Sequence, residues 1–158
     1  MKIIQLTNGA SVQVDDDDYE ELSIFKWHAC KQGPRCYATR QVSFKGKKSS
    51  VRMHRQIMGV SDPKKDVDHI NMDGLCNLRS NLRVCTRSQN MMNRSAMRNC
   101  KSGLKGVSWC RYTSRWRAAI RFGGKQQHIG RFDCKIAAAK AYDEKAKELF
   151  GEYARTNF

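Results

Sequence analysis

Features that direct a chain to a membrane or to the secretory pathway are missing from this sequence of 158 residues. The first five residues are followed by polar ones, so no signal peptide is expected, and no apolar run approaches the ~20 residues that a transmembrane helix needs. The seven cysteines are odd in number and include no Cys-x-x-Cys pair, which removes the basis for a four-cysteine zinc site and predicts reduced thiols. We therefore expect a soluble cytoplasmic protein that has no structural zinc and does not bind a membrane.

Acidic residues are also scarce, and their shortage grows along the chain. Thirty Lys and Arg oppose 15 Asp and Glu, which gives a net charge of +15. By region, the net charge is +2 over residues 1–50 (8 basic, 6 acidic), +4 over 51–95 (8 and 4) and +9 over 96–158 (14 and 5). Such a gradient indicates a polyanionic partner bound mainly at the C-terminal end. A generally basic, solvated surface is the alternative, but aromatic residues and glycines interleave with the charges, which favours nucleic acid.

The N-terminal third predicts small β-elements and a short helix. Asn8-Gly9 is typical of a type I′ turn inside a hairpin over residues 3–14, and a second alternating stretch covers residues 35–52. The four aspartates at 15–18 predict the start of a helix near 16–24, because carboxylates suit the positive end of the helix dipole. We prefer this capping role to a metal site, since nothing else nearby in the sequence offers ligands.

The C-terminal third predicts one compact unit. Three strand-like runs, over 105–110, 115–122 and 126–131, precede an amphipathic helix over 135–149. A three-stranded antiparallel sheet packed on one helix is the simplest architecture for these elements, so the predicted fold class is α+β. The predicted parts are a β-rich accessory region over 1–50, a central module over 51–95, a linker over 96–103 and a C-terminal domain over 104–158.

The central module concentrates residues that suit phosphodiester hydrolysis. That reaction needs a base that takes a proton from water, and a cation that neutralises charge on the phosphate and the leaving oxygen. His69 has the ordinary pKa of such a base, and Asp68 beside it can bind a metal while His69 faces the water. Thr86 can cap a helix over 87–96 that carries Asn90. Because Asp and Asn oxygens are hard ligands, the sequence favours Mg²⁺ (or Mn²⁺) over zinc.

Three motifs in this module occur together. They are Val67-Asp68-His69-Ile70-Asn71, Gly74-Leu75-Cys76-Asn77-Leu78-Arg79-Ser80-Asn81-Leu82-Arg83 and Gln89-Asn90. Over roughly residues 1–95 the chain resembles the HNH endonucleases of the homing type that are common in phages. The resemblance implies a ββα-metal (His-Me finger) nuclease module, with His69 as the general base, Asp68 and Asn90 as metal ligands, and Asn81 bracing the loop that carries His69.

Two positions depart from that family. Asn90 stands where many members have His, and Cys76 stands where an Asp is common. Because of Cys76, an alternative function stays open, namely a DNA-binding regulator with a degenerate nuclease module. His54 lies in the segment Met53-His54-Arg55, which also resembles the family, and we predict that it packs behind the loop as a structural residue.

The C-terminal domain resembles a different family. Its segments 103–109, 115–120, 128–133, 137–143 and 150–158 are similar, in the same order, to the plant APETALA/ethylene-response-factor domain. The resemblance implies a three-stranded sheet that enters the major groove of DNA, with the helix behind it. Several base-reading Arg and Trp positions of the plant family are Ser108, Cys110 and His128 here, so the plant target sequence does not carry over.

The residues of this domain support DNA binding independently. A twisted ribbon fits the major groove, and Arg117 and Arg121 share a strand face because side chains alternate along a strand. Trp116 and Ile120 alternate with these arginines and are predicted to pack in the core. The predicted DNA contacts are Lys105, Arg111, Arg115, Arg117, Arg121, Lys125 and Arg131.

These patterns predict a site-specific DNA endonuclease of the homing type, acting on double-stranded DNA with one divalent metal and no small-molecule cofactor. One motif copy per chain predicts that a monomer nicks DNA, so a double-strand break needs a homodimer or a second event. The alternatives are the DNA-binding regulator and a small basic RNA-binding protein, which would need neither Asp68 nor Asn90.

Overall fold

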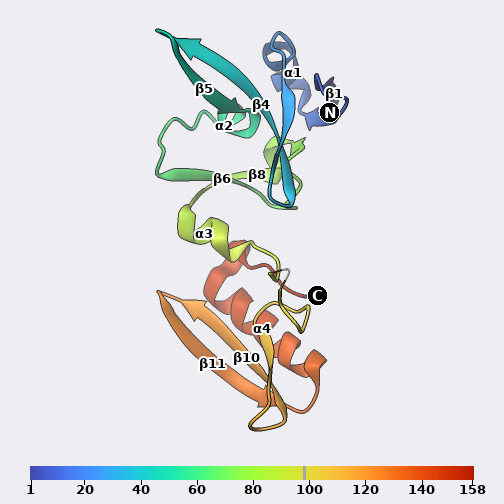
Figure 1. Cartoon of the computed structure of the whole chain (residues 1–158), viewed down its shortest axis with the longest axis vertical. Coiled ribbons are helices and arrows are strands. Elements are labelled where there is room, and N and C mark those ends of the chain that lie inside the picture. Colours follow the sequence, from blue (N-terminus) through green and yellow to red (C-terminus); the bar gives the residue numbers. More distant parts are fainter. Residues whose placement is uncertain (98) are drawn as a thin grey trace. The chain divides into compact units, whose positions relative to one another are not determined.

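The computed structural model describes residues 1–97 and 99–158, which form two compact units (Figure 1). Unit 1 comprises Met1–Arg87 and unit 2 comprises Ser88–Phe158. Both mix a few helices with small sheets, which is compatible with the predicted α+β class. Within the described residues, every helix is too short or too polar to cross a lipid bilayer. Arg98, which belongs to the predicted linker 96–103, lies outside the described residues, and the predicted four-part division stays a prediction.

Unit 1 holds three small sheets. Their strand orders are β1-β2-β7, in which β7 runs parallel to β2, then the antiparallel meander β3-β4-β5, and the antiparallel pair β6-β8. The elements are β1 (Lys2–Gln5), β2 (Ser11–Val14), α1 (Asp16–Ser23), β3 (His28–Gln32), β4 (Arg35–Phe44), β5 (Lys47–Arg52), α2 (Met53–Ile57), β6 (Lys65–His69), β7 (Cys76–Asn77), the 3₁₀ turn η1 (Arg79–Asn81) and β8 (Leu82–Thr86).

The core of unit 1 forms where the predicted hairpin meets the first helix. The hairpin is confirmed, and it turns Val12 and Val14 fully inward. Its turn is not of type I′ as predicted, because Gly9 has φ 82° but Asn8 does not take a positive φ. Leu22 of α1 and Trp27 are each 1% exposed, and the Trp27 indole donates to the Leu22 carbonyl at 2.8 Å. Each such side chain contributes about 1.5–3 kcal/mol through its burial. This core supports the loops that carry the candidate site.

The acidic run makes long-range contacts that the sequence did not indicate. Helix α1 begins at Asp16 as expected, but the side chain of Asp15 does not cap it. Its Oδ2 instead accepts the backbone N–H of Arg79 at 2.7 Å. The Asp18 carboxylate binds the Arg79 guanidinium at 2.6 and 2.9 Å. These aspartates therefore attach η1, next to the candidate site, to the N-terminal helix.

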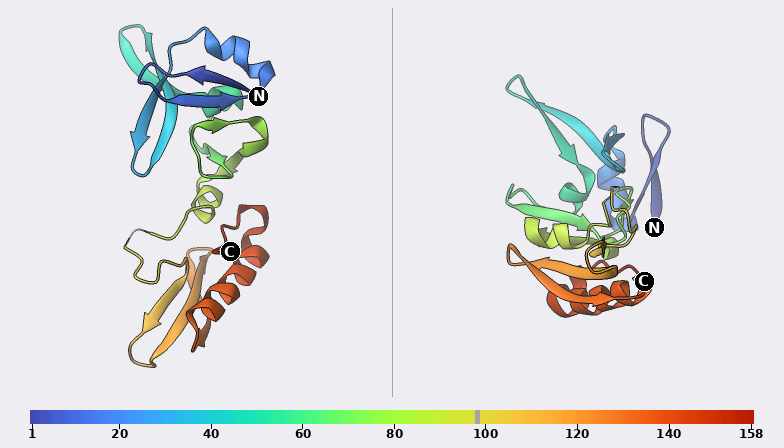
Figure 2. Two further views of the ribbon diagram at one scale, coloured as in Figure 1. Left: turned by 90° about the vertical axis from the view of Figure 1, so that its right-hand side faces the viewer. Right: turned by 60° about the horizontal axis from the view of Figure 1, so that its bottom comes forward.

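Unit 2 matches the predicted sheet and helix closely. The strands are β9 (Val107–Cys110), β10 (Arg115–Phe122) and β11 (Lys125–Phe132), in the antiparallel order β11-β10-β9. Helix α4 (Lys135–Phe150) lies along one face of this sheet (Figure 2), and η2 (Gly151–Tyr153) follows it. Ala138, Ala139 and Ala146 of α4 are fully buried, since their small side chains let the helix approach the sheet. Trp116 and Ile120 pack on this side, as predicted.

A short helix, α3 (Arg87–Met92), joins the two units in the sequence. The predicted helix over 87–96 is therefore correct in its start and wrong in its end, because the helical hydrogen bonding stops at Met92. Asn93, which the longer helix would have carried on the face of Asn90, lies in a turn and is 3% exposed.

Close backbone packing in unit 2 requires a glycine at one point. Gly106 has φ 73°, and a Cβ there would lie 2.0 Å from Cδ2 of Tyr142 and 2.8 Å from the Ala119 carbonyl oxygen. The chain next to it is held by its own C-terminal residues, because the Asn157 side chain bonds both the N–H and the carbonyl of Lys105. The buried Asp143 carboxylate accepts the backbone N–H groups of Asn157 and Phe158.

Candidate functional site

Asp68 and His69 lie side by side at the end of β6. The register with β8 sets Asp68 opposite Arg83 and His69 opposite Leu82. Both side chains are buried, with residue exposures of 2% and 3%. A buried ionisable pair at a strand end is unusual for a purely structural position, since burial disfavours the charged form of each group.

The orientation of His69 is set by Asn77, a residue that sequence reasoning missed. The imidazole Nε2 and the Asn77 Oδ1 are 2.9 Å apart, and Asn77 is fully buried at the end of β7. The Asn77 amide nitrogen points the other way, 3.6 Å from the sulfur of Met53. Because an amide oxygen only accepts, Nε2 is the protonated nitrogen and Nδ1 keeps its lone pair. The usable signal was an amide inside the second motif, eight residues after His69.

Two further rings pack against His69. The His54 ring meets it edge to face with centroids 4.9 Å apart, and the Tyr37 ring lies at 5.8 Å. His54 thus packs against the predicted base, as the sequence suggested. Its Nδ1 has no hydrogen-bond partner among the described residues.

Both imidazoles are neutral near pH 7. Burial lowers the pKa of His69, an effect that the bond from Asn77 and the charge of Asp68 partly oppose. Burial and the neighbouring His69 lower the pKa of His54 to about 3. A neutral His69 can accept a proton, which is the first requirement for a base.

Asn81 braces the loop that follows His69, as the resemblance implied. Its Oδ1 accepts the backbone N–H of Asn71 at 3.0 Å, and its Nδ2 donates to the Asn71 side chain at 3.0 Å and to the Cys76 carbonyl at 2.8 Å. The backbone N–H of Ile70 also donates to the Asn81 carbonyl, at 2.9 Å. Four bonds thus tie both ends of the loop to one residue.

The same loop passes very close to strand β4. A Cβ at Gly74 would lie 2.3 Å from the Cys36 carbonyl oxygen and 2.6 Å from Cδ1 of Tyr37. Met72 takes a left-handed conformation with φ 67°. The loop is therefore fixed by contact with β4 as well as by Asn81.

Oxygen donors for a cation are present, with Asp68 as the central one. Its Oδ2 accepts from Nε and Nη2 of Arg83 at 3.1 and 2.8 Å, an ion pair whose side chains are only 1% and 11% exposed. Within the described residues, no three His, Cys, Asp or Glu side chains gather as a metal centre would need. A site made of Asp68 and amide oxygens is of a different kind, and such hard donors suit Mg²⁺ or Mn²⁺. Asn90, the other predicted ligand, is half-buried on α3 and belongs to unit 2.

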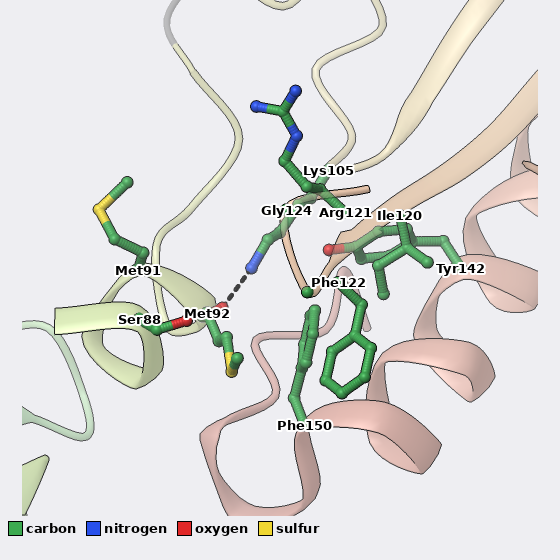
Figure 3. A pocket seen from close by; sticks show the side chains of 11 residues that line it. Ser88, Met91, Met92, Lys105, Ile120, Arg121, Phe122, Gly124, Tyr142 and Phe150 are labelled. Carbon is green, nitrogen blue, oxygen red and sulfur yellow. Dashed lines mark hydrogen bonds between the residues drawn. The ribbon is translucent and has the colours of Figure 1, made fainter. Parts of the chain in front are cut away.

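The end of helix α3 packs against the core of unit 2. The Met92 side chain packs against the cluster of Ile120, Tyr142 and Phe150, beside a pocket of about 330 Å³ (Figure 3). The Lys105 ammonium donates to the Met92 carbonyl, at the end of the helix. Burial lowers the pKa of Lys105 to about 8. Lys105 thus lines the same pocket as Arg121, another predicted DNA contact, but its ammonium group is bonded within unit 2.

Four of the remaining predicted contacts, Arg115, Arg117, Arg121 and Arg131, lie on the face of the sheet that α4 leaves uncovered. Arg117 pairs directly with Arg131 across β10 and β11, and with Ser108 on the other side. Arg115, Arg117 and Arg121 alternate with the buried Ala118 and Ile120. Directly opposed like charges destabilise a sheet, so this row indicates an anionic partner. Arg111 and Lys125 are exposed at the ends of the strands, and Arg115 pairs with Asp133 at 2.9 Å.

Comparison with known proteins gives matches over both parts of the chain. A family described as "HNH endonuclease" matches residues 51–92. An AP2-like ethylene-responsive transcription factor of Arabidopsis thaliana is 42% identical over 65 residues, which are 41% of this chain but only 13% of that protein. No solved structure matches.

Two viral proteins match this chain over a larger share of their own length. An uncharacterized HNH endonuclease of Acanthamoeba polyphaga mimivirus is 31% identical over 155 residues, which cover 94% of this chain and 75% of that protein. Protein 3.8 of Escherichia phage T7 is 33% identical over 89 residues, or 56% of this chain and 73% of that protein. Together with the braced histidine loop, these matches establish that the chain belongs to the HNH endonuclease family.

Proposed function

We propose that this chain is a metal-dependent DNA endonuclease of the homing type in which His69 is the general base. The observation that carries the proposal is the bond between His69 Nε2 and Asn77 Oδ1. It leaves Nδ1 as the proton acceptor and holds the ring in one orientation, which are the two properties that a base in hydrolysis needs.

In the proposed reaction, Nδ1 of His69 takes a proton from a water molecule whose oxygen attacks phosphorus. The bond from phosphorus to the leaving oxygen breaks, its electron pair stays on that oxygen, and solvent supplies the proton. The lowered pKa of His69 keeps the base form populated at neutral pH. Asn81 holds the loop next to His69, so the ring does not need to be reoriented during the reaction.

We assign a divalent cation, Mg²⁺ or Mn²⁺, to Asp68 and Asn90. When bound, such a cation neutralises charge that develops on the phosphate and the leaving oxygen. Arg83 holds one oxygen of Asp68 and so fixes the plane of the carboxylate. The donor chemistry supports this assignment, because carboxylate and amide oxygens are the ligands these ions prefer.

The substrate that we propose is double-stranded DNA, bound by the uncovered face of the β9–β11 sheet. The arginine row on that face offers phosphate and base contacts with the geometry of a ribbon in the major groove. With one histidine loop in each chain, a monomer nicks one strand.

Cys76 does not favour the alternative of a degenerate nuclease. The brace from Asn81 goes to the Cys76 backbone carbonyl, and the side chain of Cys76 is buried. The bond is therefore independent of which side chain stands at this position.

The test of the base is nicking of supercoiled plasmid in Mg²⁺. His69→Ala should lower the rate about 10²–10⁴-fold while DNA binding in EDTA stays at the wild-type level. His28→Gln is the matched control, since His28 lies in the same unit and bonds Thr39 instead. Equal nicking by His69→Ala and the wild type would reject the proposed base.

The test of the cation site is Mn²⁺ binding followed by electron paramagnetic resonance. Asn90→Ala and Asp68→Asn should each weaken binding, while Asn99→Ala, at an exposed position, should not. If Asn90→Ala binds Mn²⁺ and nicks DNA like the wild type, Asn90 is not a ligand and the assignment fails.

A further inference from the structure

The hairpin of β4 and β5 extends away from the rest of unit 1 in every view (Figures 1 and 2). We call its outer part, residues 41–50, the basic ribbon. Nine of its ten residues are exposed and Val42 is half-buried. Residues Gln41 to Phe44 pair in register with Lys47 to Ser50. Lys45 and Gly46, at φ 48° and 75°, form the tight turn between them, so the ribbon is a defined two-stranded element.

The charge around this ribbon is of one sign. Residues 22–61 contain nine Lys and Arg and no Asp or Glu. The small net charge of residues 1–50 hides this excess, because all six acidic residues of that region lie between positions 15 and 21. Three of those six are engaged elsewhere, Asp15 and Asp18 with Arg79 and Asp16 with the N-terminal amine.

The basic side chains at the base of the hairpin have partners within unit 1. Arg40 donates to the Gln56 side chain at 3.2 and 3.3 Å and stacks on Phe25 at 3.9 Å, and Arg52 donates to Gln32 at 2.8 Å. Within residues 1–97 and 99–158, by contrast, no carboxylate forms an ion pair with Lys45, Lys47 or Lys48. Their charges face solvent at the end of the ribbon.

An aromatic ring accompanies these lysines. Phe44 is 74% exposed, directly opposite Lys47 in the register, and the Lys45 ammonium lies 5.5 Å from its ring centre. Nucleic-acid-binding surfaces combine basic side chains, which contact phosphates, with aromatic rings, which pack on sugars and bases. The end of the ribbon offers both kinds of side chain.

We propose that the basic ribbon is a second DNA-binding element, separate from the β9–β11 sheet. Lys45, Lys47 and Lys48 contact backbone phosphates, and Phe44 packs against the sugars or base edges of the groove that the ribbon enters. A two-stranded antiparallel ribbon fits the major groove of B-form DNA. The inference rests on the proposed function only in taking duplex DNA as the partner.

The test is the salt dependence of binding to a duplex of about 30 base pairs in EDTA, where no cutting occurs. Each phosphate contact adds about 0.9 to the slope of log K against log [salt]. Lys47→Gln with Lys48→Gln should therefore lower the slope by about 1.8. The matched control, Lys140→Gln with Lys147→Gln, removes two exposed lysines of α4 and should leave the slope unchanged.

Phe44→Ser, which loses no charge, should weaken binding without changing the slope. Because these side chains are exposed, all variants should melt like the wild type. A ribbon variant with the wild-type slope and affinity on DNA overturns the proposal, as does an effect confined to structured RNA or to an acidic protein. Plasmid nicking in Mg²⁺ is measured separately. If the wild type does not nick but the ribbon variant lowers the slope, the nuclease proposal fails and the ribbon proposal stands.

Discussion

The two units of this protein use their polar residues in different places. In unit 1, His54, Asp68, His69 and Asn77 are all 3% exposed or less, and His54 and Asn77 contact the His69 imidazole. In unit 2 the sheet and helix meet through alanines, and the arginines of β10 and β11 stand on the uncovered face. A buried polar group must be oriented by partners to be tolerated, whereas an exposed cation needs none. Unit 1 therefore holds its polar groups in fixed orientations inside the fold, whereas unit 2 presents its cations on an open surface.

The comparison predicts that changes in unit 1 alter the nicking rate and the stability in acid, while changes on the surface of unit 2 alter the affinity for DNA.

The largest expected effect breaks this pattern, because it concerns the interior of unit 2. In Gly106→Ala the new Cβ would meet the Tyr142 ring and the Ala119 carbonyl, in a left-handed conformation. We expect a loss of about 3–5 kcal/mol in the unfolding free energy of unit 2.

The control for that change is Gly123→Ala, at φ 58° with nothing within 4 Å of the new Cβ. It should cost only the conformational penalty of about 1–2 kcal/mol. Urea unfolding followed by the fluorescence of Trp109 and Trp116 measures both. Equal losses in the two variants would mean that the close passage over Tyr142 is not a stabilising feature.

The second prediction concerns Asn77 as a positioning residue for His69. Asn77→Leu, of similar volume, should lower the nicking rate about 10–100-fold. The hydrogen bond from His69 to Asn77 raises the pKa of His69. Loss of this bond should therefore move the acidic limb of the pH–rate profile to lower pH. Asn77→Asp keeps the acceptor and adds negative charge, and should move that limb to higher pH. A merely structural role would lower the rate in both variants without these opposite shifts.

The third prediction contrasts the two units in acid. The pKa of His54 falls from 6.5 to about 3 on folding. Below pH 6.5 the unfolded chain therefore binds more protons than the folded one, and unit 1 should lose stability as the pH falls, by about 2 kcal/mol at pH 5. Unit 2 has one histidine, the exposed His128, so it contains no buried histidine that would cause such a loss.

Urea unfolding of a Trp109→Phe, Trp116→Phe background isolates the signal of Trp27 in unit 1, and so measures that loss. His54→Leu serves as the comparison and should show a flatter dependence on pH between about 7 and 5. If it keeps the full dependence, His54 is not the group responsible.

The fourth prediction separates stability from binding in unit 2. Arg117→Ala removes a like charge opposite Arg131, so the unfolding free energy of unit 2 should rise by about 0.2–1 kcal/mol. Binding to duplex DNA should weaken by about 1–2 kcal/mol. An equal loss on every sequence identifies a phosphate contact, and a loss that depends on one base pair identifies a base contact. Unchanged affinity would remove Arg117 from the interface.

The smallest effect is expected from Lys105. Its pKa is about 8 in the folded chain against an ordinary 10.5, so between these values the unfolded chain binds more protons. The two pKa values alone would give a rise of about 2 kcal/mol in the stability of unit 2 between pH 7 and 9.5. Because Lys105 is partly exposed and solvent screens its charge, we expect only a fraction of that rise. The upper limit avoids Tyr142, whose raised pKa of about 12 acts in the opposite direction above pH ~10. Lys105→Met should show a smaller rise in urea unfolding, because Cys110 and Cys134 of unit 2, whose pKa values are also lowered on folding, still contribute.

Local patterns in the sequence predicted much of this fold. Asn8-Gly9 identified the first hairpin, and the alternation of Trp116 and Ile120 with arginines identified β10 and its buried face. Both signals depend on residues within one strand or one turn. The motif around Asp68, His69 and Asn81 located the histidine loop and its brace.

Contacts between distant residues could not be predicted in the same way. Strand β7 has only two residues and pairs in parallel with β2, more than 60 positions earlier. This pairing is what buries Asn77 against His69, so the partner of the base stayed hidden. Asp15 and Asp18 read as helix caps because their true partner, Arg79, is equally remote. A side chain's local pattern does not specify which distant group it meets.

The packing of α3 on unit 2 limits how the proposed DNA-cutting and DNA-binding parts could be recombined. Lys105 and the cluster around Tyr142 hold the last turn of the helix that carries Asn90. A chimera that exchanges the proposed DNA-binding part at residue 104 would therefore leave that helix without its support, whereas a junction before Ser88 would transfer the helix together with the residues that support it. An exchange of the proposed DNA-binding domain therefore has to include Asn90, the proposed metal ligand.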